Sequence, residues 1–376
     1  MRYVRSDDQE FFRATTARFL AELVPPERLR SLRDDPTGYD LDYWRRGADL
    51  GWTSLLASED HGGSISGEAL VDLTLVAHEF GAHAAPGPLV PGNVVVAALS
   101  DARSHPDVLA GVMAGTVIVA WCDGEFSSDP TSSSAVEIRI DGEELVLTGL
   151  VRPSESAAVA HSLLVAGRSG TGATQVLVPS AAPGVSISPM SSVDLTRRFS
   201  AVRFDNVRVP VGALVGGFGA AGGAVLRQRQ IAFVLAAAES VGAMQTAFDM
   251  TVEWSFDRYS FGRPLASYQA LKHRFADMKT WLEASHAIAD AAAKAMATGA
   301  DNAAEKVHAA MAFIGQYGSE LLQDCVQLHG GLGVTFEHDI HLYLRRHTLN
   351  RSLYGGPNVH RQMITDLLDQ RDGVAA

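Results

Sequence analysis

The spacing of apolar residues changes twice along the chain. Between residues 7 and 100, apolar side chains recur at helical intervals in two runs, around 11–20 and around 70–80. A turn-rich stretch, LGWTSLLASEDHGG (50–63), separates the two runs, and its glycines interrupt the helical pattern. The sequence therefore predicts that the N-terminal part is built of helices.

An alternating pattern follows. VEIRIDGEELVLTG (136–149) alternates apolar and polar residues on both sides of Asp141-Gly142, a dipeptide favoured by type I′ hairpin turns. Further short strands are expected at 162–168, 174–179 and 200–210. The helical period returns over 222–374, with an alanine-rich stretch at 281–298.

Helices, then an antiparallel sheet unit, then helices again is the order of an α+β chain in three parts. We expect a helical domain over 1–115, a β-domain over 116–215 and a helical domain over 216–376.

Composition and charge exclude several classes of function. The hydrophobic content of 47% with 20% charged residues is ordinary for a soluble globular protein. A formal charge of −12 argues against nucleic-acid binding, because there is no excess of lysine and arginine to neutralise phosphates. No apolar run predicts a membrane span, and the N-terminus turns acidic before a signal peptide could form. The 2 cysteines are too few for a disulfide framework, so a cytoplasmic location is expected.

Two short motifs resemble known binding sites, but we expect neither to be one. Residues 217–222 fit the G-x-G-x-x-G pattern, but they follow an antiparallel-type strand and we expect a connection between domains there. His338, Asp339 and His341 have metal-binding side chains but lack a further spaced ligand. We expect solvated or interface histidines at that point, and no metal site.

Three longer segments carry a family resemblance. VQLHGGLGVTFEHDIHLYLRRHTLNRSLYGGPNVHR (326–361) resembles the C-terminal signature of the acyl-CoA dehydrogenases, flavoproteins that oxidise the Cα–Cβ bond of a CoA thioester. LGWTSLLASEDHGG (50–63) and RYSFGRPLASYQALKHRFADM (258–278) resemble two further blocks of that family. The resemblance covers nearly the whole chain. It implies an N-terminal helical domain, a middle antiparallel β-domain, a C-terminal four-helix bundle and bound FAD.

The resemblance also implies where FAD is bound. An arginine fixed beside a helix break can pair with a phosphate through two parallel hydrogen bonds, and paired glycines let a phosphate or ribose approach the backbone. Without the resemblance, the same residues would be read as a salt bridge, a core aromatic and a helix C-cap. In the family, one such group holds the adenosine side of FAD, and the other contacts FAD bound mainly by a neighbouring subunit. The matching residues here are Arg258, Phe261 and Gln269 for the first group, and Gln327, Gly330 and Gly331 for the second.

The flavin side departs from the family pattern. Where the family has a catalytic glutamate, this chain has Tyr354, or Gly355 if the alignment slips by one residue, and neither is a base at neutral pH. In the loop over flavin and thioester, the usual threonine is replaced by Cys122, while Ser128 remains as a candidate substrate contact. The usual Trp-Ile-Thr of the next strand is Pro-Ser-Glu (153–155), which places a carboxylate beside a ring that must accept hydride.

Glu239 is an alternative base. Some family members carry the glutamate on the first long helix of the C-terminal domain, where this chain has Ala232. Glu239 lies two turns further on, within an apolar run where desolvation would raise its pKa. A structural glutamate with a charged partner is the competing interpretation.

Four hypotheses follow. The first is a degenerate subunit of an actinobacterial, steroid-CoA type dehydrogenase, which completes the FAD site of a catalytic partner in an α₂β₂ tetramer and passes electrons to an electron-transferring flavoprotein. The second is a self-sufficient homotetramer that uses Glu239 as its base. The third is a related flavin monooxygenase, which needs no glutamate, and the fourth is a non-catalytic scaffold subunit.

Overall fold

The computed structural model describes residues 5–63, 68–123 and 136–374. The first part is helical, as predicted. Ser6 caps the first helix, because its hydroxyl accepts from the Gln9 backbone while the Gln9 side chain accepts from the Ser6 backbone. Trp52, which is fully buried, packs edge-on against Phe19 and Phe80 and joins this helix to the fourth. The helices are α1 (Asp7–Leu23), α2 (Pro26–Ser31), α3 (Leu41–Asp49), α4 (Ala69–Ala82), α5 (Leu89–Asp101) and α6 (Pro106–Met113), with short 3₁₀ turns η1 (Leu32–Asp34) and η2 (Glu59–His61).

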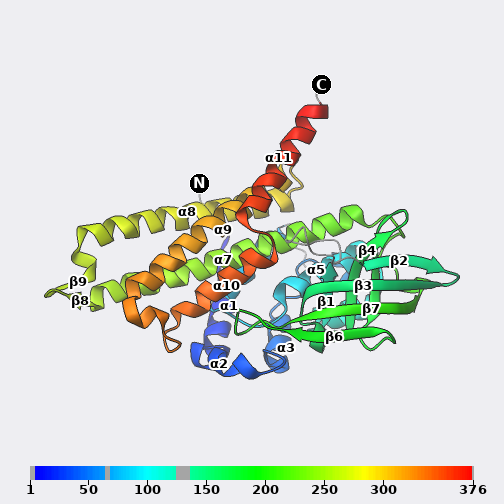
Figure 1. Cartoon of the computed structure of the whole chain (residues 1–376), viewed down its shortest axis with the longest axis horizontal. Helices are drawn as coiled ribbons and strands as arrows, with labels where there is room; N and C mark the ends of the chain where they lie inside the picture. Colours follow the sequence, from blue (N-terminus) through cyan, green and yellow to red (C-terminus); the bar gives the residue numbers. More distant parts are fainter. Residues whose placement is uncertain (1–4, 64–67, 124–135, 375–376) are drawn as a thin grey trace.

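A seven-stranded sheet follows at one end of the molecule (Figure 1). Its order is β1-β4-β2-β3-β7-β6, and β5 pairs with β4. The expected hairpin is present, but its loop residues are Gly142-Glu143, one position later than predicted, and Gly142 takes a φ of 65°. The strands are β1 (Val119–Asp123), β2 (Val136–Asp141), β3 (Glu144–Glu155), β4 (Ser162–Ser169), β5 (Gly172–Pro179), β6 (Val185–Met190) and β7 (Phe199–Pro210).

The sheet is mixed: four of its strand pairs are antiparallel, as the sequence predicts, and the pairs of β4 with β1 and with β2 are parallel. β1 pairs with β4 in parallel, with Val119 opposite Ser162. Two antiparallel strands, β2 and β3, intervene in the sequence, so β4 re-enters the sheet in the direction of β1. The pattern of residues 119–123 did not predict this strand, because three of its five side chains are buried and no clear alternation marks it.

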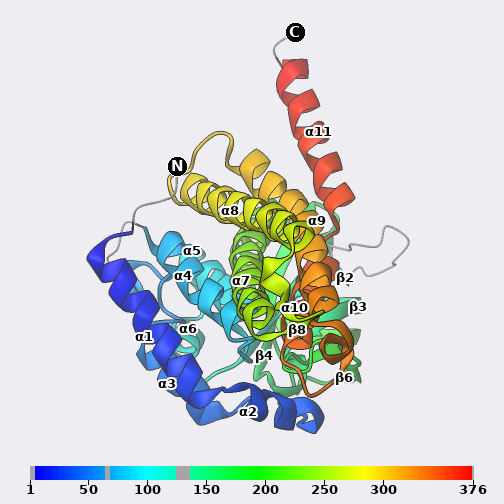
Figure 2. The same cartoon turned by 90° about the vertical axis from the view of Figure 1, so that its left-hand side faces the viewer.

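The last part is a helical bundle (Figures 1 and 2). The first four of its helices pack against one another, and the fifth projects from the body of the molecule. A small hairpin of β8 (Tyr259–Ser260) and β9 (Arg263–Pro264) joins the first helix to the second, at the end of the bundle farthest from the sheet. The helices are α7 (Gly222–Asp257), α8 (Gln269–Ala297), α9 (Ala303–His329), α10 (Ile340–Leu353) and α11 (Pro357–Val374), with a 3₁₀ turn η6 (Gly330–Val334) after α9.

α7 is the central helix of the fold. By length and composition alone it could cross a membrane, but 89% of its most apolar window is buried inside the protein. It packs against α4, α5, α8, α9 and α10. α7 is therefore a core helix and not a membrane span.

Two glycines set the crossing of α4 and α7. A Cβ placed on Gly242 would lie 1.9 Å from the carbonyl oxygen of His78, and one on Gly81 would lie 1.7 Å from that of Glu239. Both contacts are to backbone, which cannot move aside without shifting a whole helix. The two helices therefore pack backbone to backbone, and this fixes where the N-terminal helices sit relative to the bundle.

Replacing Gly242 with alanine is expected to destabilise the fold by at least about 2 kcal/mol, because overpacking a tight contact forces backbone shifts. Gly223→Ala is the matched control: it lies in the first turn of the same helix, with open space around it, and alanine is the better helix former. Urea denaturation of both variants tests this. A Gly242→Ala protein as stable as the wild type would contradict it.

Candidate functional site

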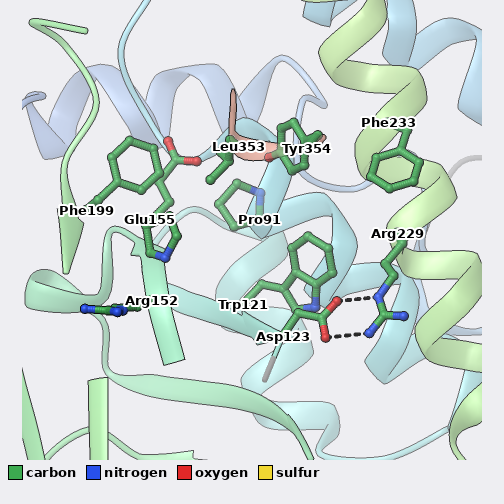
Figure 3. A pocket seen from close by; sticks show the side chains of 11 residues that line it. Pro91, Trp121, Asp123, Arg152, Glu155, Phe199, Arg229, Phe233, Leu353 and Tyr354 are labelled. Atoms are coloured by element: carbon green, nitrogen blue, oxygen red, sulfur yellow. Dashed lines mark hydrogen bonds and ion pairs between the residues drawn. The ribbon is translucent and has the colours of Figure 1, made fainter. Parts of the chain in front are cut away.

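A pocket opens where the sheet, the N-terminal helices and the bundle meet (Figure 3). Its side chains come from α5, β1, β3, β7, α7 and the end of α10, so it forms only in the complete fold. Aromatic rings supply much of the wall. The lining residues are Pro91, Trp121, Asp123, Arg152, Pro153, Glu155, Phe199, Arg229, Phe233, Leu353 and Tyr354.

Both carboxylates of this pocket are held by arginines. Asp123 on β1 receives two hydrogen bonds from Arg229 on α7, at 2.6 and 2.9 Å, across the pocket in Figure 3. Glu155 at the end of β3 receives two from Arg197, at 2.7 and 2.5 Å, and both side chains are buried. Parallel double hydrogen bonds of this kind are strong and directional. Each carboxylate is thereby held in a fixed orientation by an arginine.

Tyr354 closes α10 and lies in the pocket wall. Its side chain is only 6% exposed, and burial raises the pKa of the phenol well above its usual value. The hydroxyl therefore stays neutral at physiological pH. Gly355 follows with a φ of 96° and has no side chain to offer. Neither residue at this position can act as a general base.

The predicted cofactor residues lie at the opposite end of the bundle, and all are exposed. Arg258 and Phe261 sit in the link that carries the β8–β9 hairpin, and Phe261 is 97% exposed. Gln269 begins α8, and Gln327 lies in the last turn of α9. The structure thus brings two segments about 70 residues apart in sequence to one end of the molecule.

The glycines of this end leave the backbone accessible. Gly330 takes a φ of 62°, in a conformation that favours glycine, and a Cβ on Gly330 or Gly331 would meet no atom within 4 Å. Ring contacts link the two segments: the centroids of the Trp254 and His329 rings are 5.5 Å apart, and those of His329 and His338 are 4.3 Å apart. The Arg258 guanidinium lies 5.9 Å from the Trp254 ring. A cation, an aromatic ring and open backbone therefore share one exposed surface.

This surface and the pocket are far apart within one chain. Phe233 in the pocket and Arg258 at the bundle end are separated by 25 residues of α7 and its C-cap. At 1.5 Å per helical residue, that separation is about 37 Å. The two features therefore lie at separate places on one chain.

Two sequence models identify the chain. The C-terminal domain model of the acyl-CoA dehydrogenases matches residues 217–368, and the N-terminal domain model matches residues 6–102. Together they match more than half of the 376 residues. The chain belongs to the acyl-CoA dehydrogenase family.

Individual relatives agree with this assignment. Acyl-CoA dehydrogenase IpdE2 of Mycolicibacterium smegmatis is 29% identical over 356 residues, which cover 94% of this chain and 96% of the relative. Two solved structures share the fold. A Tcur3481–Tcur3483 steroid ACAD variant has a TM-score of 0.86 at 24% identity, over 98% of this chain and 99% of that one. The ChsE4–ChsE5 complex from Mycobacterium tuberculosis has a TM-score of 0.85 at 23% identity, over 98% of this chain and 99% of that one.

Acyl-CoA dehydrogenases use FAD, and the two ends of this chain fit that cofactor differently. The exposed arginine and the open glycine backbone at the bundle end suit a pyrophosphate and an adenosine. The pocket suits a flavin ring poorly, because two ion pairs occupy its walls. Ser128, the candidate substrate contact, lies outside the residues that the structure describes.

Glu239 belongs to a buried ionic network beneath the pocket. Its Oε1 accepts from Arg346 at 2.7 Å, and its Oε2 accepts from Asn350 at 2.7 Å and lies 3.5 Å from Arg197. Arg346 also pairs with Asp194, so five charged side chains (Glu155, Arg197, Glu239, Arg346 and Asp194) form one continuous chain. Burial alone would raise the pKa of Asp194, but the adjacent Arg346 lowers it overall.

This network was not predicted from the sequence. Its arginines come from the approach to β7 and from α10, and no local pattern links them to Glu239. The one available signal was the presence of single charged residues in otherwise apolar runs, which calls for partners of opposite sign. Because both carboxylate oxygens of Glu239 are hydrogen-bonded and Glu239 does not line the pocket, the geometry favours the structural interpretation over the catalytic one.

The histidine and aspartate cluster near residue 340 has other partners. His338 accepts from the backbone of Ile340, His341 contacts the carbonyl oxygen of Phe336, and Asp339 pairs with Arg30. Among the described residues, no group of three or more histidine, cysteine or acidic side chains could hold a metal ion.

Two buried histidines make stability depend on pH. Burial lowers the pKa of His347 and of His360 to about 4, against 6.5 for an exposed histidine. The unfolded chain therefore binds protons below pH 6.5 while the folded chain does not until about pH 4. Stability is fully present above pH 6.5 and is lost as pH falls from 6.5 toward 4.

We expect the free energy of unfolding to be roughly 2 kcal/mol lower at pH 5 than at pH 7 for each of these histidines. Denaturant midpoints at the two pH values provide the measurement. His360→Gln should weaken the pH dependence, while His273→Gln, at an exposed position of α8, should leave it unchanged. An equal pH dependence in all three proteins would rule out this account.

Proposed function

We propose that the chain is the degenerate subunit of a heteromeric acyl-CoA dehydrogenase. In this proposal the bundle end completes an FAD site whose flavin pocket and catalytic base belong to a partner chain. The partner's carboxylate removes the α-proton of the CoA thioester. Bound FAD would supply the hydride acceptor for the Cβ–H bond.

The state of the pocket is the observation that carries this proposal. Its two carboxylates, Asp123 and Glu155, are each locked by an arginine, and Tyr354 stands where the family's glutamate is expected. A general base has to reach the substrate and accept its proton. Asp123 and Glu155, the carboxylates that line this pocket, would each have to leave an arginine to do so.

The bundle end supports the other half of the proposal. Arg258 and the backbone of Gly330 and Gly331 are exposed at this end, and so are several apolar side chains of the same two segments. Exposed apolar groups beside a cation are typical of a surface that another molecule covers. The exposed apolar side chains there are Phe256, Tyr259, Phe261, Leu332, Val334 and Phe336.

The substrate class and partners follow from the relatives. One similar structure is a steroid ACAD, and another is a complex of two differently named chains, ChsE4 and ChsE5. We therefore propose a CoA ester of a steroid-derived acyl group as the substrate and an α₂β₂ assembly. An electron-transferring flavoprotein is the proposed electron acceptor.

Self-sufficient catalysis through Glu239 is the competing proposal. It would require Glu239 to leave Arg346 and Asn350, which would remove one of the two carboxylates that pair with the buried Arg346. Activity of the chain alone, whether as a dehydrogenase or with O₂, would favour this proposal or the monooxygenase proposal. A flavin-free complex with an active partner would favour a scaffold role.

Co-expression with a catalytically complete partner should give an α₂β₂ tetramer with about one FAD per αβ pair, following the closed symmetry of such assemblies. The chain alone should bind little FAD, because each site would combine an intact half with an obstructed one. Native mass measurement and flavin absorbance test both statements. A tetramer of this chain alone with one FAD per subunit would refute the pairing.

Arg258→Ala should lower the FAD occupancy of the αβ assembly by tenfold or more, because hydrogen bonds between a guanidinium and a phosphate are charge-assisted. The chain should stay folded, since the side chain is exposed. Arg203→Ala, an exposed arginine on β7, is the control and should keep its flavin. Full FAD retention by the Arg258 variant would mean that Arg258 has no part in cofactor binding.

A further inference from the structure

The segment after the glycine pair is held from outside the bundle. Residues 335–339 connect η6, which begins with Gly330 and Gly331, to α10 without regular structure. Arg30 on α2, about 300 residues away in sequence, donates to the carbonyl oxygens of Phe336 and Glu337 at 3.3 and 2.7 Å. It also pairs with the side chain of Asp339.

One guanidinium therefore contacts three residues of this connection at once. Its planar fork of donors can reach several acceptors in fixed directions, which a lysine ammonium cannot do equally well. Arg33, one helical turn along, places its guanidinium 5.3 Å from the Phe336 ring. His341 also stacks on that ring, with the centroids 4.9 Å apart, and contacts the Phe336 carbonyl oxygen at 3.0 Å.

The segment that carries Arg30, residues 26–35, is itself held in place. Arg198, at the start of β7, donates to the carbonyl oxygens of Arg33 and Asp35, at 3.1 and 2.7 Å, and to that of Leu32. Residues 26–35 thus link the middle domain to residues 335–339. The two glycines begin η6, and without side chains their backbone has more conformational freedom than that of other residues.

Stability is a weak explanation for these contacts. The Arg30 and Asp339 side chains are 21% and 29% exposed, so water would satisfy both them and the two carbonyl groups if the contact were lost. Partly exposed ion pairs contribute little to the free energy of folding. What the contact does restrict is the path of the chain just beyond the open glycine backbone.

We propose that Arg30 is a positioning residue for FAD: it holds the Gly330-Gly331 turn in the geometry that receives the cofactor of the neighbouring site. This inference rests on the proposed function. It adds that the N-terminal domain of this chain, which contains none of the predicted FAD residues, sets the affinity of a site shared with the partner.

The test measures FAD affinity in the αβ assembly. The flavin is removed, and FAD is titrated back while flavin fluorescence is followed. Arg30→Ala should weaken FAD binding by about tenfold, with an unchanged tetramer mass and an unchanged kcat at saturating FAD. Arg30→Lys should give an intermediate loss, because the charge remains but the fork does not. Arg28→Ala is the matched control: it lies on the same short helix, is exposed, and contacts Leu23 and Asp40 instead.

Two results would overturn the inference. One is an FAD affinity for Arg30→Ala within twofold of the wild type. The other is loss of the tetramer at an unchanged affinity, which would make Arg30 a residue of assembly. Arg258→Ala separates this inference from the proposed function: if Arg258→Ala also keeps full affinity, Arg258 has no part in cofactor binding and the proposed role of the bundle end fails with it. If only Arg30→Ala keeps it, the proposed function stands and the positioning role fails.

Discussion

The structure depends on a chain of five buried charges. Glu155, Arg197, Glu239, Arg346 and Asp194 join the end of β3, the approach to β7, α7 and α10. Arg346 extends the connection to α4, because it donates to the carbonyl oxygens that follow that helix. All three domains therefore meet at one set of hydrogen bonds.

Such a network is costly to form and more costly to break. Desolvating an ion is unfavourable, and only good geometry with further hydrogen bonds compensates for it. Here Arg346 also donates to the Thr196 hydroxyl, and Asn350 donates to the Glu239 carboxylate, so polar groups of the ion pairs have further hydrogen-bond partners. Removing one member of a buried pair typically destabilises a protein by about 3–5 kcal/mol, because the other charge remains buried and unpaired. The packing of α4 on α7 through Gly81 and Gly242 brings these segments close enough for the network to form.

The network also shapes the pocket. Glu155 lines it, and Asn350 sits one turn before Tyr354 on α10, so the same contacts that hold the domains together orient the pocket wall. Arginines hold both carboxylates of the pocket in fixed positions. The opposite end of the bundle has the reverse character, with exposed cations, exposed rings and open backbone. This contrast fits the proposal that the bundle end contributes to cofactor binding, while the residues around the pocket hold the domains together.

The sequence alone determined the order of the three parts, most helices, the hairpin and the family. These features follow from local periods, turn residues and motifs that short stretches of chain carry by themselves. The sequence also indicated Arg258 and the Gly330-Gly331 turn as candidate FAD-binding residues. The family resemblance placed Tyr354 at the position of the family's catalytic base. Only the tertiary structure decided that Glu239 lies in an ionic network, that Asp123 faces Arg229 and that Arg30 reaches residues 336–339. Each of these pairs joins residues 100 or more positions apart. Such contacts are set by how helices and sheet pack, and no period or spacing in the sequence encodes that packing.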